Sequence, residues 1–452
     1  MKPFPLRLTP FEEYMLHDDR PTHPMSIWMR LRLRGRMDAQ RLERALAAGV
    51  QRHPLLGCLV NSRGPGQHYW ELQPANQPTI ASHTAAPGEY PTASAINLAR
   101  EVGLRTWLRQ AAEESEIFWQ FHHTAVDGMG AFQFVADVLK HYAGDDSVPS
   151  SSVADSVATL QGRNQFGLTT WKLLKMAPAQ ATGLLGAREF LSHRPVPLTP
   201  HDGQLAAENP HEILPTALSA SLTTEETTRL RQAARSRQVT MNDLLIRDLL
   251  LALFAWRAAR GLARDDDWLR LSVPMNLRTP EASPQSGTNV VSMVFIDRQP
   301  PRALQPDELL QSIHDQMALI KRRQLGLTFI FSLHAARWLP GGIRKTTAGN
   351  NCLATSVITN LGEPLAGLKF PQQDGKLLVN ELLLEDLEVL APLRPQTQVA
   401  FSAWTYAGCL KLALHYDRRI IEADQARDLH QRFLLAVRDS LRLSDSARSP
   451  AV

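Results

Sequence analysis

Alternating hydrophobic and polar positions predict strands at several points in the chain. Residues 27–33 alternate apolar side chains with Trp28 and arginines, which predicts a half-exposed strand with a charged outer face. Residues 117–121 show the same period of two with aromatic side chains, which is typical of a buried strand. The near-continuous apolar run at 290–296 predicts a strand buried on both faces, and residues 399–416 predict a hairpin.

Helical spacing of apolar residues predicts amphipathic helices between these strands. Asp38 can cap a helix that ends before Pro54, and residues 132–142 form a second helical pattern that Gly144 closes. The most apolar run, 244–259, carries three charged residues and is too short to span a bilayer, so we interpret it as a buried helix. Residues 423–441 predict a closing amphipathic helix.

The order of strands and helices in each half predicts layered α/β architecture. A chain of 452 residues, 44% of them hydrophobic, can bury a large core and is expected to form about two domains. Five prolines interrupt any periodic pattern within residues 193–215. We therefore predict two halves, residues 1–199 and 200–452, without an internal sequence repeat.

The stretch from Phe121 to Gly128 concentrates the candidate chemistry, between a predicted strand and a predicted helix. His122 and His123 point to opposite faces, so they cannot do the same job. A neutral imidazole can take a proton from a hydroxyl or amine and pass it on. Asp127 either orients that ring or braces the turn, and Gly128 permits a backbone conformation that a side chain would oppose. The alternative is a packed histidine pair beside a turn aspartate.

The motif His-His-x-x-x-Asp-Gly at a strand end resembles the signature of the superfamily that joins condensation domains and chloramphenicol-acetyltransferase-like acyltransferases. Two further stretches resemble this superfamily in the same order: residues 273–278 with 287–289, and residues 356–362. The opening residues 8–10 and the helix end at 52–56 also resemble its N-terminus. The similarity spans nearly the whole chain.

This resemblance implies two chloramphenicol-acetyltransferase-like α/β halves that flank a central substrate tunnel. His123 is then the general base midway along the tunnel, and His122, Asp127 and Gly128 support the geometry of the site. An arginine at a strand end can form a bidentate pair with a carboxylate, and the resemblance implies such a pair between Arg278 and Asp127.

Asn289, Asn360 and Gly362 are the candidate substrate-binding residues. We expect the amide of Asn289 to line the substrate channel, and the resemblance places the turn that contains Asn360 and Gly362 near the site. No metal is expected there, and no bound cofactor. Acyl-coenzyme A or an acyl-phosphopantetheine serves instead as a co-substrate.

The resemblance implies an acyltransferase that moves an acyl group from a thioester to an alcohol. Amide or ester formation with a carrier-bound acyl group is an alternative, and so is a non-catalytic homologue. Gly57 stands where many members have arginine, and the Asp-Phe-Gly-Trp-Gly stretch of the plant enzymes is absent from the sequence. Alcohol acyltransferases and wax ester or diacylglycerol synthase-like proteins are the nearest branches.

The net charge and the cysteine content limit which partner molecules and which cell compartment we expect for this protein. A net charge of +4, with basic residues spread along the chain, favours no nucleic-acid partner. The three cysteines lack metal-ligand spacing and are interpreted as buried thiols in a reducing compartment. The N-terminus lacks the apolar core of a signal peptide, so we expect a cytoplasmic protein. We also expect a monomer. Residues 170–176 could contact a membrane surface, although we favour a helix packed on its own protein.

Overall fold

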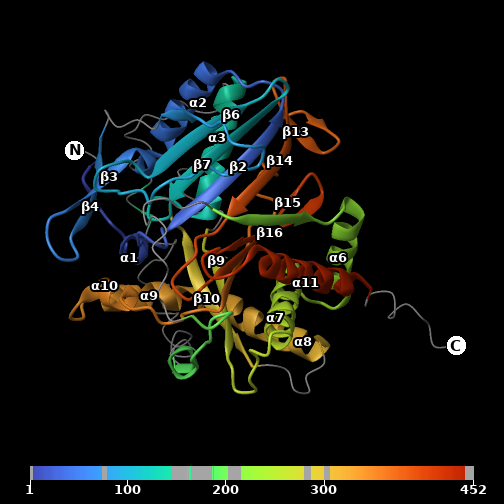
Figure 1. The fold of residues 1–452 in the computed structure, drawn as a ribbon. Coiled ribbons are helices and arrows are strands. Elements are labelled where there is room, and N and C mark those ends of the chain that lie inside the picture. Colours follow the sequence, from blue (N-terminus) through green and yellow to red (C-terminus); the bar gives the residue numbers. More distant parts are fainter. Residues whose placement is uncertain are drawn as a thin grey trace.

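The chain folds into two α/β lobes, shown in Figure 1. The computed structural model describes residues 4–73, 79–144, 160, 162–163, 186, 188–201, 215–278, 287–299 and 306–442. Each lobe is built around one large sheet, and the two main hydrophobic cores follow the same division. The segment 170–176, considered above for membrane contact, lies outside the described residues.

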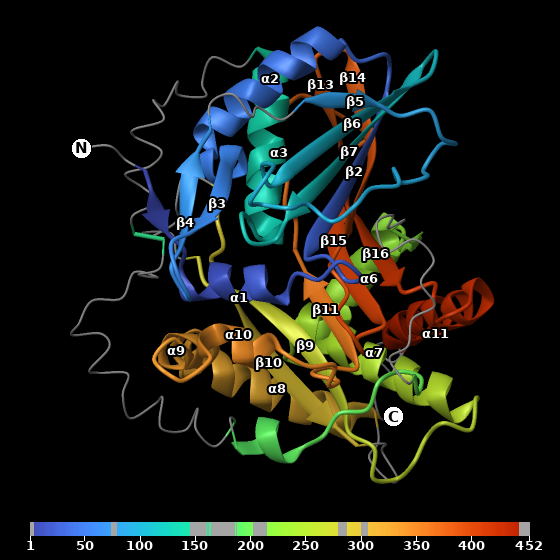
Figure 2. The same ribbon diagram turned by 60° about the vertical axis from the view of Figure 1, so that its left-hand side comes forward.

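The first lobe contains a seven-stranded sheet, antiparallel except for its last pair, β5 with β6. In spatial order its strands are β12 (Gln372–Gln373), β13 (Lys376–Val379), β14 (Leu382–Leu390), β2 (Ser26–Arg34), β7 (Glu114–His122), β6 (Leu104–Gln110) and β5 (Ile80–Ser82). Helices α2 (Ala39–Arg52) and α3 (Gly128–Ala143) pack together on one face of this sheet (Figure 2). The ring of Phe134 on α3 meets that of Phe121 on β7 edge to face, at 5.7 Å.

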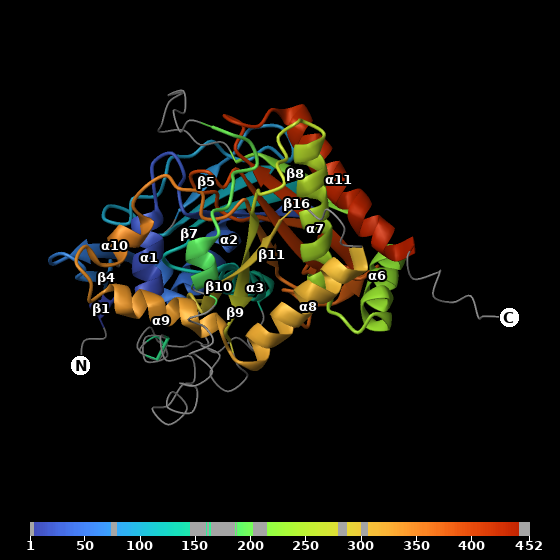
Figure 3. The same ribbon diagram turned by 90° about the horizontal axis from the view of Figure 1, so that it is seen from below.

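The second lobe contains a six-stranded mixed sheet. Its strands in spatial order are β10 (Val291–Arg298), β9 (Leu269–Asn276), β11 (Ser356–Asn360), β15 (Val399–Tyr406), β16 (Cys409–Tyr416) and β8 (Ala217–Ser221). The helices associated with it are α6 (Thr224–Ser236), α7 (Met241–Ala258), α8 (Pro306–Arg322) and α11 (Ala423–Arg442). Figure 3 shows α7 between α8 and α11, and both of these helices contact it.

A smaller layer lies beside the junction of the lobes. It contains a three-stranded sheet in the order β1 (Leu6–Arg7), β4 (His68–Leu72) and β3 (Cys58–Ser62), together with the short helix η1 (Pro54–Gly57). Helix α1 (Pro10–Asp18) packs against α9 (Gly326–Ala336) and α10 (Gly342–Thr347) from the second half of the chain. This layer thus joins segments that are far apart in sequence.

Strands from the second half of the chain also extend the first lobe's sheet. β14 pairs antiparallel with β2 along nearly its whole length, and β13 and β12 continue the sheet beyond it. The predicted division near residue 200 therefore describes the chain order, while residues 372–390 cross back into the first lobe. A strand gains its hydrogen bonds from whichever sheet edge it meets, so this crossing leaves no local sequence signal.

Local signals predicted most of these elements correctly. Asp38 accepts a hydrogen bond from the Arg41 backbone as the cap of α2, and Gly144 ends α3 in a left-handed conformation with φ 74°. The hairpin of β15 and β16 and the closing helix α11 are also confirmed.

Other local predictions were wrong. β10 was expected to be buried on both faces, but it is the edge strand of its sheet and alternates buried with half-buried residues. The glycine-containing stretch before residue 350, for which no helix was predicted, contains α9 and α10.

None of the helices formed by the described residues is both long enough and apolar enough to cross a membrane.

Candidate active site

The His-His-x-x-x-Asp-Gly motif forms the turn between β7 and α3. His122 is the last residue of β7, Asp127 is the N-cap of α3, and Gly128 is the first residue of that helix. The backbone N–H of His123 donates to the carbonyl of Met25 on the neighbouring chain segment at 2.7 Å. Because a central strand and a capped helix hold both ends of the turn, its side chains are fixed relative to the sheet.

A cavity of about 1900 Å³ is lined by residues from both lobes. His123 and Ile27 contribute from the first lobe, and Asn276, Met293 and Asn360 contribute from the second. Pockets that hold one small ligand usually measure about 300–1,000 Å³. The cavity beside the imidazole is therefore larger than one small ligand requires.

The side chain of His123 faces this cavity from the end of β7. Phe11 on α1 packs near its ring, with centroids 6.2 Å apart, and Nδ1 is buried without a hydrogen-bond partner among the described residues. Burial lowers the pKa of His123 below its usual 6.5, and this outweighs the opposing attraction of the Asp127 charge. The ring is thus held neutral at physiological pH, the state required of a proton acceptor.

His122 points away from the cavity, as the alternation along a strand requires. Its Nδ1 accepts a hydrogen bond from the backbone N–H of Thr124 at 3.1 Å, and its Nε2 lies 3.6 Å from a carboxylate oxygen of Asp19. The side chain is buried. These contacts fit the packing role predicted for His122.

Asp127 braces the turn rather than orienting the imidazole. Its Oδ1 accepts from the Gly130 backbone at 2.7 Å, its Oδ2 accepts from the Val290 backbone at 2.8 Å, and Arg278 donates to both oxygens at 2.9 Å. Arg278 also donates to the carbonyl of Thr288 at 2.8 Å. The structure therefore brings together the two residues expected to pair, and the pair joins the motif turn to the loop that follows β9.

The glycines near the motif act through close packing. Gly128 was expected to permit a backbone conformation that a side chain would oppose, but its φ is not positive. A Cβ there would instead lie 3.1 Å from a methyl group of Leu361. At Gly130 a Cβ would come within 3.0 Å of the backbone N and O of Thr288. Gly130 thus allows the start of α3 to approach the backbone of Thr288 closely, and sequence reasoning missed it because close approach between distant segments has no local pattern.

Asn289 holds the back of the motif turn. Its side-chain amide donates to the carbonyls of His123 at 2.8 Å and Thr124 at 2.9 Å. The residue is buried and is not among those that line the cavity. The geometry therefore corrects its expected position on the channel wall: Asn289 fixes the backbone of the motif turn instead.

Replacing Asn289 with alanine is expected to lower kcat with little change in KM. The two carbonyls would lose their donor, so His123 would no longer be held in one position, while the cavity wall would be unaltered. Steady-state kinetics measure the split. Asn360→Ala is the matched control, because that side chain lines the cavity and its loss is expected to raise KM. An Asn289→Ala variant that raises KM alone would restore the channel-wall role.

Asn360 and Gly362 form the turn after β11. The Asn360 side chain lines the cavity, and its Oδ1 accepts from the Gly362 backbone at 3.1 Å. Gly362 has a positive φ of 64°, which favours glycine, and its carbonyl accepts from the Thr405 backbone. Asn360 thus lines the cavity, whereas Gly362 shapes the turn without lining it.

His53 is a further contact between the lobes that sequence reasoning did not single out. The Gly287 backbone donates to His53 Nδ1 at 2.6 Å, so Nε2 carries the proton and donates to Asp137 at 3.0 Å. The residue is fully buried, and burial lowers its pKa. Burial by itself would raise the pKa of Asp137, but the hydrogen bond from His53 and the charges of Arg52 and Lys140 together outweigh it and bring the pKa of that carboxyl to about 2. The sequence around His53 gave no indication that its hydrogen-bond partner would be Gly287.

Burial keeps two of the three cysteines in the thiol form. Cys58 is buried, as predicted, whereas Cys352 and Cys409 are half-buried. Burial raises the pKa of Cys352 to about 12 and that of Cys58 further still. Neither of these two thiols is a thiolate at physiological pH, and none of the three cysteines lines the cavity.

Comparison with known proteins gives one family match and a related mycobacterial sequence. Residues 212–327 match the family described as "Phthiocerol/phthiodiolone dimycocerosyl transferase C-terminus". An uncharacterized protein of Mycobacterium tuberculosis, recorded in two strains, is 26% identical over 299 residues. This match covers 64% of the present chain and 66% of that relative, so it spans slightly less than two thirds of the relative's length.

Solved structures with the same fold cover almost the whole chain. The first condensation domain of the CDA synthetase is 12% identical with a TM-score of 0.66 and covers 97% of this chain and 96% of its own. Trichothecene 15-O-acetyltransferase from Fusarium sporotrichioides is 13% identical with a TM-score of 0.68, at 96% and 95% coverage. Polyketide synthase associated protein 5 from Mycobacterium tuberculosis is 16% identical with a TM-score of 0.63, at 96% and 97% coverage. The family match is confined to residues 212–327, and the solved structures show that this chain shares the two-lobed fold of condensation domains and acetyltransferases.

Proposed function

We propose that this protein transfers an acyl group from a thioester to an alcohol, with His123 as the general base. The observation that carries the proposal is a neutral imidazole on a cavity that both lobes line. The family match and the fold support an acyltransferase that moves groups other than aminoacyl groups. An alcohol acceptor is favoured because one structural neighbour is named as an O-acetyltransferase.

The reaction needs one proton acceptor that returns its proton. The imidazole of His123 takes the proton of the acceptor hydroxyl while the oxygen attacks the thioester carbonyl carbon, and the carbonyl electron pair moves to oxygen. Collapse of this tetrahedral intermediate breaks the carbon–sulfur bond. The protonated ring then gives its proton to the departing thiolate, so the products are an ester and a free thiol, and His123 is neutral again.

The surrounding residues position that ring. Arg278 and Asp127 tie the motif turn to the second lobe, and Asn289 holds the carbonyl of His123 itself. Such fixed contacts keep the base in one orientation while two substrates meet beside it, which lowers the entropic part of the barrier. Asn360, which lines the cavity from the second lobe, is the residue we assign to substrate contact.

The donor is an acyl thioester of coenzyme A or of a carrier-bound phosphopantetheine. Both carry the same long arm, which reaches a base inside the protein only through an extended passage between the lobes. We propose that the cavity is part of such a tunnel, with the acceptor arriving from the other side. Condensation domains among the structural neighbours favour the carrier-bound form as the second candidate, with amide as well as ester formation.

Thiol release tests the proposal directly. Purified protein is incubated with acyl-coenzyme A of several chain lengths and with panels of alcohols and amines, and free thiol is measured over time. We expect acceptor-dependent release with alcohols. Release only with an acyl carrier protein would select the second candidate. An absence of turnover with every donor and acceptor would indicate a non-catalytic homologue.

The pH profile of kcat/KM is expected to fall only on the acid side of pH 6.5. His123 must be neutral to accept a proton, and burial lowers its pKa below the usual 6.5. Activity should therefore not fall on the alkaline side of pH 7 through His123, and should decline about tenfold per pH unit once the pH is below the pKa of His123. A profile with its acid midpoint above pH 7 would contradict the assignment.

Stability must be followed over the same range as a control. His53 also has a lowered pKa in the folded protein, so below about pH 6.5 the unfolded chain binds more protons at this position than the folded chain. The contribution of His53 to stability therefore falls as the pH is lowered through that window. Circular dichroism at each pH separates this loss of fold from protonation of His123.

A further inference from the structure

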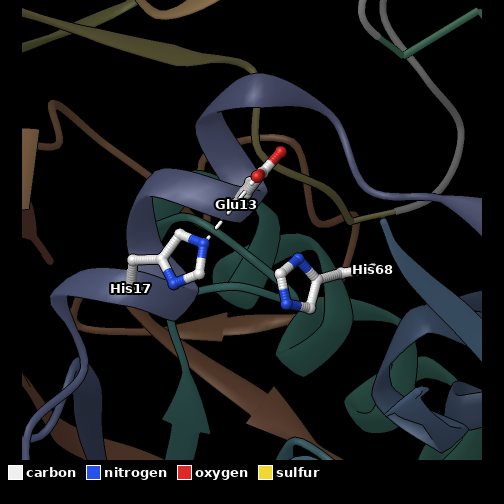
Figure 4. A group of neighbouring side chains, drawn as sticks. All are labelled: Glu13, His17 and His68. Atoms are coloured by element: carbon white, nitrogen blue, oxygen red, sulfur yellow. Dashed lines mark ion pairs between the residues drawn. The ribbon is translucent and has the colours of Figure 1, made fainter. Parts of the chain in front are cut away.

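A cluster of possible metal ligands lies outside the catalytic cavity. Glu13 and His17 are one turn apart on α1, and His68 is the first residue of β4. One ligand atom from each residue lies within 4.8 Å of the others. Figure 4 shows the two imidazole rings on neighbouring elements with the carboxylate of Glu13 beside them. None of the three lines the cavity.

The spacing of these atoms suits a small coordination site. Glu13 Oε1 lies 3.7 Å from His17 Nε2. Ligand atoms about 2.0–2.2 Å from a tetrahedral zinc ion are separated from one another by about 3.3–3.6 Å. The helical pair thus needs almost no movement. The ligand atoms of the three residues lie up to 4.8 Å apart, and rotation of the half-buried imidazole side chains can bring them to coordination distance.

His68 supplies an independent indication. Its Nδ1 is buried and has no hydrogen-bond partner among the described residues. Buried polar atoms normally have a partner, so an orphan nitrogen beside a second imidazole and a carboxylate requires an explanation. Edge-to-face contact of the rings, whose centroids are 5.1 Å apart, accounts for their packing but satisfies neither nitrogen.

Arg337 determines which ion the cluster can prefer. Its guanidinium contacts Glu13 Oε2 at 2.8 Å and 2.7 Å, which orients the carboxylate and leaves Oε1 to face the histidines. The same arginine neutralises the carboxylate charge. Affinity must therefore come chiefly from the two imidazoles, which suit zinc, nickel and copper, whereas magnesium and calcium require oxygen ligands.

We propose that Glu13, His17 and His68 bind one divalent transition-metal ion of the zinc class and that this ion fastens α1 to β4. Water would complete the coordination, as in other sites with three protein ligands. The neighbouring residues Tyr14, Met15 and Asp18 of α1 line the catalytic cavity. The ion would therefore stabilise one wall of the active site without taking part in the reaction.

Metal titration of the full chain tests this proposal. Protein stripped with a chelator and dialysed is titrated with zinc chloride by calorimetry, and with magnesium and calcium chloride at the same concentrations. We expect one equivalent of zinc, a higher Tm with zinc present, and no binding of magnesium or calcium. Loss of a direct ligand in His17→Ala or His68→Ala should weaken zinc binding by at least about 10-fold, since even outer partners of a ligand contribute that much. His83→Ala, remote from the cluster, is the matched control.

Two further measurements keep the test decisive. The Tm of each stripped variant is compared with that of the stripped wild type, which detects misfolding. X-ray absorption at the zinc edge of the wild type should show two imidazoles among oxygen and nitrogen ligands. This result does not depend on whether the variants fold. Absence of zinc binding by the wild type, unchanged affinity in both folded histidine variants, or a spectrum with fewer than two imidazoles would overturn the proposal.

Discussion

Replacing His123 with alanine is expected to lower kcat by about 10²–10⁴-fold while leaving the fold intact. The ring lies on the cavity and is held neutral by burial, so its removal takes away the proposed proton acceptor. The side chain makes no hydrogen bond through Nδ1 among the described residues, so few stabilising contacts are lost with it. Thiol release under saturating substrate and the Tm of the variant measure the two effects.

His83→Ala is the control for the loss of a histidine elsewhere in the first lobe. Its ring contacts the carbonyl of Glu89 at the sheet edge and is not among the cavity residues. We expect wild-type turnover from this variant. A His123→Ala protein that turns over at the wild-type rate, with its fold verified, would remove His123 from the mechanism and leave the cavity as a binding site.

Replacing Arg278 with alanine is expected to reduce both stability and activity. The side chain is 7% exposed and makes a bidentate pair with the buried carboxylate of Asp127. Removing one partner of a buried pair leaves the other charge uncompensated, which costs about 3–5 kcal/mol of unfolding free energy. The motif turn would also lose its tie to the second lobe. Denaturant unfolding and thiol release report these losses separately.

The matched control is an arginine with an exposed partner. Arg427 pairs with Asp424 on the surface of α11, where both side chains are largely exposed. Arg427→Ala is expected to cost less than about 1 kcal/mol, because water screens and solvates such pairs. Arg278→Lys would retain the charge but lose the bidentate geometry and should give an intermediate result. Equal stability of Arg278→Ala and the wild type, with full activity, would exclude the bracing role.

Much of the local structure could be predicted from the sequence. Helix α3 follows from apolar spacing and from the capping residue Asp127, and the capping box of Thr223 and Glu226 starts α6. Strand β7 follows from its period of two. These features depend on residues within one or two turns of each other, so a short window contains all the information that they need.

The candidate site was only partly predictable. Alternation along a strand requires the two histidines to face opposite sides. Which of them faces the cavity depends on the side of the strand that the other lobe covers. Asn289 was expected on the channel wall, yet its amide meets the carbonyls of His123 and Thr124. An asparagine side chain can serve a ligand or a backbone equally well, and only the position of the partner decides between them.

The sequence by itself determined the alternation of strands and helices, the caps that begin and end them, and the resemblance that singled out the motif. The tertiary structure decided the contacts between distant segments: Arg278 with Asp127 across 151 positions, Gly287 with His53 across 234, and β14 within the first lobe's sheet. Hydrogen bonding along a helix or turn is local, whereas burial and the choice of a partner depend on how separate elements pack.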